Sequence, residues 1–211
     1  MATTRKSGAA TSARGKAESA TPRKTKSSAK ANLAATKSAS AKSPARKPAA
    51  AATIEAADLV GRRAPDFSLP DQDGALVSLR SLTEKGDVVL YFYPKDMTPG
   101  CTVEACCFRD AIGKIRALGA QVVGVSADSA SSHRRFIDKH GLNFPLLSDP
   151  DNRITAAYGV YRKKSLYGRE YMGIERTTFI IGRDGIVKRV FPKVKVNGHA
   201  DEVIAALENR S

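Results

Sequence analysis

The stretch DVVLYFYPKDMTPGCTVEACCFRDAIGKIRAL, residues 87–118, decides the fold. Its first part, DVVLYFYP at 87–94, is a short apolar run rich in β-branched and aromatic residues, which is typical of a strand buried on both faces. Further on, apolar residues recur three or four positions apart, at Phe108, Ile112 and Ile115. This spacing predicts a helix over 101–118, with Gly119 at its C-terminal cap.

The flanking sequence continues the alternation of strands and helices. Two hairpins are predicted, at 64–82 and 177–191, because each has Asp-Gly between two strand-like runs. The other predicted elements are strands at 120–127 and 144–149 and helices at 129–140, near 151–157 and at 199–209. This order predicts an α/β sandwich in which helices flank a central mixed sheet. Residues 54–211 are long enough to form it as one domain.

The charge is divided unevenly along the chain. The 211 residues hold 35 Lys and Arg and 21 Asp and Glu, a formal net charge of +14. Residues 1–53 hold twelve basic side chains and one acidic one, so the remaining residues carry a net charge of only +3. The first 53 residues lack aromatic side chains, and apolar burial there cannot offset roughly 1–2 kcal/mol of backbone entropy per residue. We predict a disordered basic tail at 1–53.

Three roles for this tail remain open. The segments TPRKTK (21–26) and SPARKP (43–48) are similar to the tails of linker histones, which indicates weak, non-specific nucleic-acid or polyanion binding. The Ser-rich, acid-poor composition also fits an organellar transit peptide, such as one for plastid import. The third role is a solubilising extension without a specific partner. No apolar run has the length of a signal sequence or a membrane span, so no membrane partner is expected.

The three cysteines, Cys101, Cys106 and Cys107, fall within seven residues. This leaves no framework of structural disulfides, so we expect a reducing compartment. No metal or cofactor is expected, because tetrahedral zinc sites need spaced ligand pairs and the histidines are scattered. Buried cysteines are often inert, but Cys101 begins a predicted helix, where free N–H groups and the helix dipole stabilise a thiolate. The Thr98 hydroxyl lies three residues earlier, within reach of that thiolate.

The segment YFYPKDMTPGCTVEACCFRD at 91–110 resembles the active-site segment of the peroxiredoxins. Pro94, Thr98 and Cys101 match the pattern P-x-x-x-T-x-x-C. Cys106 is similar to the resolving cysteine of the peroxiredoxin Q group, also called bacterioferritin comigratory proteins. The likeness extends over 58–209. A thioredoxin-like disulfide reductase is the weaker alternative, because it would need a C-x-x-C pair.

The resemblance implies a thioredoxin-like fold and thiol-dependent reduction of hydrogen peroxide and organic hydroperoxides. Cys101 would be the peroxidatic cysteine and become a sulfenic acid. Thr98 and Arg176 would orient the peroxide and stabilise the thiolate, while Pro94 would shield the sulfenate. Cys106 would then form an intramolecular disulfide with Cys101, which thioredoxin or a similar dithiol would reduce. The resemblance further suggests a monomer in the bacterial cytoplasm, with nucleoid or nuclear association and plastid import as alternatives.

The positions of the cysteines, Glu104 and two histidines lead to four further expectations. A continuous helix would hold Cys101 and Cys106 too far apart for a disulfide, so we expect local unwinding on oxidation. Cys107 departs from the pattern and is interpreted as an inert helix residue, with a competing resolver and an intermolecular thiol as alternatives. Glu104 is expected either to pair with an arginine or to favour the helix dipole. His133 and His140 are expected to be solvated.

Overall fold

The computed structural model describes residues 55–166 and 168–209, and the predicted tail at 1–53 lies outside this part of the chain. The strands are β1 (Ser68–Pro70), β2 (Leu76–Ser78), β3 (Asp87–Phe92), β4 (Ala120–Ser126), β5 (Leu146–Ser148), β6 (Tyr161–Leu166), β7 (Arg169–Ile174), β8 (Thr177–Ile181) and β9 (Val187–Phe191). The α-helices are α1 (Leu79–Thr83), α2 (Pro99–Ala117), α3 (Ala130–His140), α4 (Arg153–Ala157) and α5 (His199–Glu208), and a short 3-10 helix spans Ala56–Leu59. None of these helices is long and apolar enough to cross a membrane.

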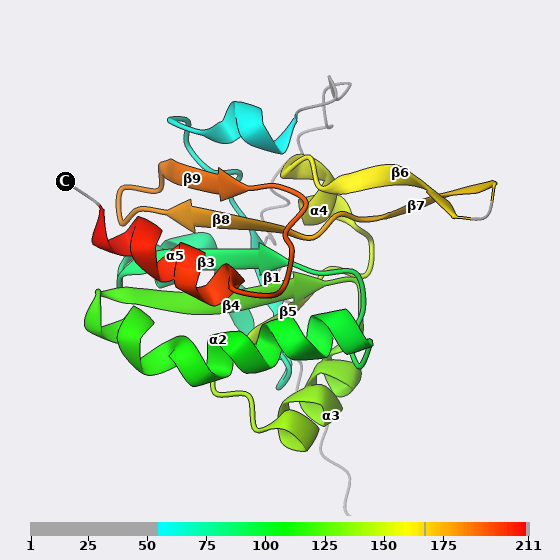
Figure 1. Cartoon of the computed structure of the whole chain (residues 1–211), viewed down its shortest axis with the longest axis horizontal. Coiled ribbons are helices and arrows are strands. Elements are labelled where there is room, and N and C mark those ends of the chain that lie inside the picture. Colours follow the sequence, from blue (N-terminus) through cyan, green and yellow to red (C-terminus); the bar gives the residue numbers. More distant parts are fainter. Residues whose placement is uncertain (1–54, 167, 210–211) are drawn as a thin grey trace, which may run out of the picture. The chain divides into compact units, whose positions relative to one another are not determined.

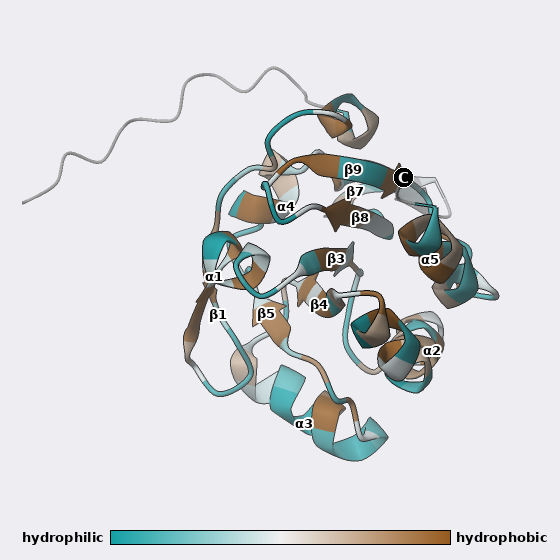
Figure 2. Ribbon diagram, turned by 90° about the vertical axis from the view of Figure 1, so that its left-hand side faces the viewer, coloured by the Kyte–Doolittle hydropathy of each residue, from teal (hydrophilic) through white to brown (hydrophobic). Residues whose placement is uncertain are grey.

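A five-stranded sheet in the order β5-β4-β3-β8-β9 forms the centre of the fold (Figure 1). β3 pairs in parallel with β4 and antiparallel with β8, so the sheet is mixed. Helices α2 and α5 cover one face, and α1 and α4 lie on the other side (Figure 2). The predicted fold class, an α/β sandwich with a mixed central sheet, is therefore confirmed.

Strand β3 shows why the apolar run at 87–94 had to be buried on both faces. Successive side chains of a strand point to opposite faces. Its alternate residues accordingly divide between two core clusters, Val88, Leu90 and Phe92 in one and Val89 and Tyr91 in the other. All five are fully buried. The strand is thus a rigid support for the loop and helix that follow it.

Helix α2 begins at Pro99, two residues before the predicted start, with Thr98 as its N-cap residue. Proline suits the first turn because its fixed φ is helical and its missing N–H would lack a partner there. The helix ends at Ala117, one residue before the predicted end, and its C-cap residue is Leu118 and not Gly119. Gly119 follows the cap, and its φ of 73° places it in the left-handed region that glycine adopts without strain. Cys101 therefore lies in the first turn of a long helix packed on the sheet.

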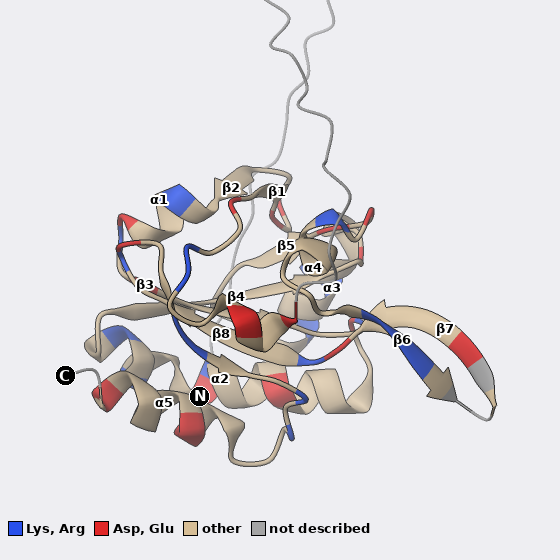
Figure 3. Ribbon diagram, turned by 90° about the horizontal axis from the view of Figure 1, so that it is seen from above, with Lys and Arg blue, Asp and Glu red and all other residues tan. Residues whose placement is uncertain are grey.

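The hairpin β6–β7 was not predicted. It projects beyond the central sheet (Figure 1) and carries both basic and acidic residues (Figure 3). Its strands are joined by polar cross-strand contacts, such as the ion pair between Lys163 and Glu170 at 2.5 Å. The strand pattern used for the sequence looks for alternating apolar residues, and this hairpin has few of them.

Candidate active site

Cys101 is the third residue of α2, and its side chain points inward, with only 1% of the residue exposed. At this position the backbone N–H groups of the first turn have no partner within the helix. They and the helix dipole favour a negative charge on the sulfur. Burial by itself opposes a charge, so the site needs a cation in contact with the thiol.

Arg176 supplies that cation from the short connection between β7 and β8. Its Nη2 donates a hydrogen bond to the Cys101 Sγ at 3.1 Å, and its Nε donates to the Glu104 Oε2 at 2.8 Å. Gly100 leaves room for the guanidinium, because a Cβ added there would lie 3.3 Å from Nη2. One arginine thus bridges a thiol and a carboxyl group that come from the same face of α2.

Glu104 is the second acid of the site. Its side chain is 1% exposed, against 20% for Arg176. Burial raises the pKa of Glu104 to about 7, although the charge and hydrogen bond of Arg176 act in the opposite direction. Its Oε1 has no hydrogen-bond partner among the described residues. The expected pairing of Glu104 with an arginine is confirmed.

Thr98 and Pro94 lie in the loop before α2. The Thr98 hydroxyl donates to the backbone oxygen of Lys95 at 3.0 Å, and the side chain is half-buried. Pro94 is exposed at the start of the loop. Of the residues predicted for the site, the structure therefore brings Cys101 and Arg176 into contact, whereas Thr98 and Pro94 lie in the loop that precedes Cys101.

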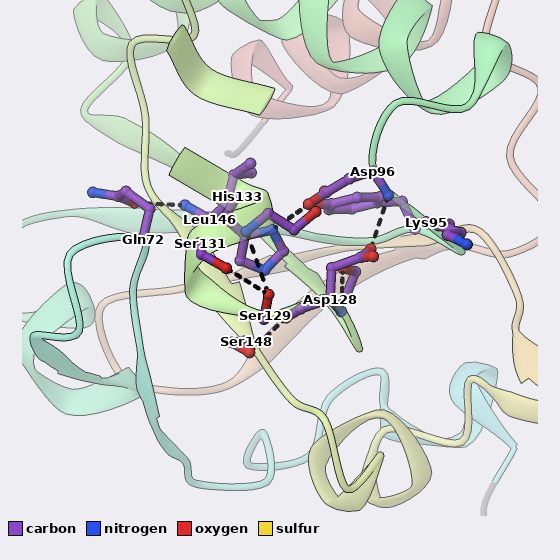
Figure 4. A network of polar contacts seen from close by, with 12 residues as sticks. Gln72, Lys95, Asp96, Asp128, Ser129, Ser131, His133, Leu146 and Ser148 are labelled. Carbon is purple, nitrogen blue, oxygen red and sulfur yellow. Dashed lines mark hydrogen bonds and ion pairs between the residues drawn. The ribbon is translucent and has the colours of Figure 1, made fainter. Parts of the chain in front are cut away.

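A buried polar network holds this loop (Figure 4). The Asp96 carboxylate accepts a hydrogen bond from the Tyr93 hydroxyl at 2.7 Å and lies 2.9 Å from the His133 Nδ1. The backbone N–H of Asp96 donates to the Asp128 carboxylate at 2.8 Å. The three contacts tie the loop to α3 and to the end of β4. Asp96 is therefore a structural residue of the site that the sequence analysis missed.

The prediction that His133 and His140 are solvated was wrong. His133 is fully buried, and His140 is half-buried with its ring against Phe136. The spacing offered a signal for His133, because it lies three residues before the fully buried Phe136, on the same face of α3. What the spacing did not reveal is the partner, since Asp96 lies 37 residues away in the chain.

Cys106 and Cys107 are both half-buried and free. Cys107 faces α5, where it lines a hollow together with Asp201 and Ile204. Burial raises the pKa of the Cys107 thiol, and the nearby Asp110 carboxylate adds to the effect. A raised pKa reduces the thiolate fraction, which is the reactive form of a cysteine.

Comparison with known proteins agrees with this fold. A model of the AhpC/TSA family matches residues 60–190. A putative peroxiredoxin bcp of Coxiella burnetii is 50% identical over 148 residues, which are 70% of this chain and 97% of the relative. Peroxiredoxin Bcp of Bacillus subtilis is 45% identical over 152 residues, 72% and 96% of the two chains.

A solved structure of Xanthomonas campestris bacterioferritin comigratory protein, described for its alkyl peroxide reduction activity, aligns with a TM-score of 0.64 and 42% identity. The alignment covers 67% of this chain and 90% of that one. The chain belongs to the AhpC/TSA family. Within it, it is a peroxiredoxin of the peroxiredoxin Q group, and therefore a peroxidase that works through thiols.

Proposed function

We propose that the chain reduces hydrogen peroxide and organic hydroperoxides, with Cys101 as the peroxidatic cysteine. The observation that carries the proposal is the 3.1 Å contact between the Arg176 Nη2 and the Cys101 Sγ in the buried first turn of α2. A thiolate there is stabilised by a guanidinium and by the helix N-terminus together. The activity described for the Xanthomonas campestris relative supports organic hydroperoxides as substrates.

In the first step the Cys101 thiolate attacks one oxygen of the peroxide. An S–O bond forms as the O–O bond breaks, and the departing oxygen takes a proton and leaves as water or an alcohol. Arg176 stabilises the charge that moves onto this oxygen. Thr98 orients the peroxide by turning its hydroxyl away from the Lys95 carbonyl, and Pro94 shields the sulfenic acid that results.

In the second step the Cys106 thiol condenses with the sulfenic acid, which forms a disulfide and releases water. Helix α2 runs unbroken through both positions, so five residues of rise hold the Cα atoms ~7.5 Å apart along the axis alone. This exceeds the ~7 Å that a disulfide spans, so the first turns of α2 unwind in the oxidised state. Thioredoxin or a similar dithiol then reduces the disulfide. Cys107 is the poorer resolver because its pKa is raised.

The test is peroxide consumption coupled to thioredoxin. Cys101→Ser should abolish turnover, and Cys106→Ser should abolish recycling by thioredoxin while Cys101 is still oxidised once. Cys107→Ser is the matched control and should turn over like the wild type. Turnover in Cys106→Ser combined with its loss in Cys107→Ser would reverse the assignment of the resolving cysteine.

A second measurement tests the unwinding. Amide hydrogen exchange in residues 99–107 should become much faster in the disulfide form, because unwinding opens their helical hydrogen bonds. Exchange in α3 should be the same in both redox states. Equal exchange of 99–107 in the two states would contradict the unwinding step.

We also propose that residues 1–53 form a basic region that associates weakly with nucleic acid, separate from the peroxidase domain at 54–211. The net charge of +11 in these residues supports it. DNA retardation by the full chain should weaken steeply with salt and vanish when residues 1–53 are deleted, while peroxidase activity is retained. Unchanged retardation without them would refute the proposal. The domain is proposed to act as a monomer in the bacterial cytoplasm.

A further inference from the structure

The steps above leave one buried acid of the site without a role. Glu104 shares the Arg176 guanidinium with Cys101, through contacts of 2.8 Å and 3.1 Å. The two acids are almost completely buried, and no other cation contacts either of them in the described part of the chain. If both were ionised, one positive charge would face two negative charges away from water, which is costly.

The groups that surround this pair do not supply the missing charge. Tyr91 on β3 and Cys107 on α2 are close enough to interact electrostatically with Glu104. Burial raises the pKa of each, so both stay neutral near pH 7. On α5, burial lowers the pKa of His199, which favours its neutral form. Lys164 on β6 is a nearby cation whose charge interacts with Cys101, but burial lowers its pKa, and its Nζ donates to the Ile174 backbone oxygen at 2.6 Å and not to either acid.

We propose that Glu104 holds a proton while Cys101 is a thiolate and releases it when peroxide consumes the thiolate, so that the site keeps a constant charge. The step reads: thiolate, protonated Glu104 and ROOH give sulfenic acid, ionised Glu104 and ROH. The sulfur supplies the electron pair for the new S–O bond, and the O–O bond breaks. The proton that leaves Glu104 balances the one that ROH takes up. The inference rests on the proposed function of Cys101.

Geometry favours this exchange. Before the reaction, Arg176 neutralises the thiolate, and Glu104 is uncharged. Afterwards the sulfenic acid is uncharged, and the Nε contact at 2.8 Å becomes an ion pair with the Glu104 carboxylate. The guanidinium therefore faces one negative charge at every stage. Glu104 acts through Arg176, as a positioning residue that also balances charge.

The experiment counts protons. A single turnover of the reduced full-length protein with hydrogen peroxide is followed in weak buffer with a pH indicator. The pH is kept just above 7, where Glu104 beside an uncharged Cys101 is ionised. The absorbance of the Cys101 thiolate, which Cys101→Ser lacks, must be present at this pH. The wild type should take up close to no protons, because Glu104 provides the one required. Glu104→Gln cannot, so it should take up about one proton per molecule. Condensation to the disulfide releases only water and does not alter the count.

Glu84→Gln is the matched control, since Glu84 is exposed on the surface and pairs with Arg80. It should behave like the wild type. Uptake of a full proton by the wild type, equal to that of Glu104→Gln, would overturn the inference. Loss of the thiolate absorbance on adding peroxide checks the peroxidase step independently. If that loss is absent in the wild type, the proposed function fails first and the inference fails with it.

The pH dependence of kcat/KM is a second measurement, and it would not change if the role of Glu104 were purely structural. Beside the thiolate, Glu104 ionises only as the pH rises further above 7, and it then competes with the thiolate for Arg176, so kcat/KM of the wild type should fall. In Glu104→Gln this fall should disappear, because the amide stays neutral. A fall of the same size and midpoint in both proteins would count against the inference.

Discussion

Replacement of Asp96 by Ala tests how firmly the loop before α2 is held. The Asp96 side chain is 2% exposed and that of His133 is fully buried. Without the carboxylate, the Tyr93 hydroxyl and the His133 Nδ1 each lose a buried partner, at about 1–3 kcal/mol per group. For the two groups together we therefore expect Asp96→Ala to lower the free energy of unfolding by about 2–6 kcal/mol.

Urea unfolding at neutral pH, with the cysteines kept reduced, measures this loss. The control is Asp110→Ala, whose carboxylate is 68% exposed and pairs with Arg109 on the surface, so the urea midpoint should stay close to that of the wild type. Tyr93→Phe combined with Asp96→Ala should cost less than the two single changes added together, because the residues share one hydrogen bond. A loss below about 1 kcal/mol for Asp96→Ala, with native-like spectra, would refute the reasoning.

Three further predictions follow from single contacts. Burial raises the pKa of Asp96, but the contacts with His133 and the hydrogen bond from Tyr93 together outweigh it and hold the pKa below its usual 3.8. The stabilisation by Asp96 is thus complete above pH about 4 and lost as the pH falls through the lower folded-state pKa, so urea midpoints of wild type and Asp96→Ala should converge in acid. Arg176→Met should lower kcat/KM for peroxide by about 10²–10³, as removal of one charge-stabilising donor does. Gly124→Ala should cost about 1–3 kcal/mol in urea unfolding, since its Cβ would lie 2.6 Å from Leu146, whereas Gly113→Ala meets no atom within 4 Å and should stabilise α2 by about 1 kcal/mol.

The sequence predicted the helices and strands in which buried apolar residues recur at regular spacing. In β3 every residue from Val88 to Phe92 is fully buried, and in α2 the buried side chains recur at helical spacing. Helix α1 escaped prediction because five residues are too few to show a period. It is set instead by hydrogen bonds between Ser78 and Ser81, which cap its first turn.

The residues of the site likewise fall into those that a local sequence pattern indicated and those that it did not. Cys101 was found because its helix start is a local feature. Arg176 lies 75 residues further along the chain, and only the family resemblance pointed to it. For Asp96 and His133, the helical spacing could have indicated that His133 is buried, but neither a local pattern nor the family resemblance pointed to Asp96 as its partner, 37 residues away. Long-range polar pairs are the part of this site that local patterns do not encode.

These contacts also limit how far α2 could open to form the proposed disulfide. On one side, the network around Asp96 fixes the loop up to the start of the helix. On the other, Phe108 is fully buried, and the Arg109 Nη1 donates to the His140 backbone oxygen at 2.6 Å, which ties the helix to α3. Between these two regions, Arg176 donates hydrogen bonds to Cys101 and Glu104. In the proposed reaction, oxidation removes the Cys101 thiolate from this contact. Unwinding should therefore start in this segment and stop before Phe108, so that the core beneath the helix stays packed while the two sulfurs meet.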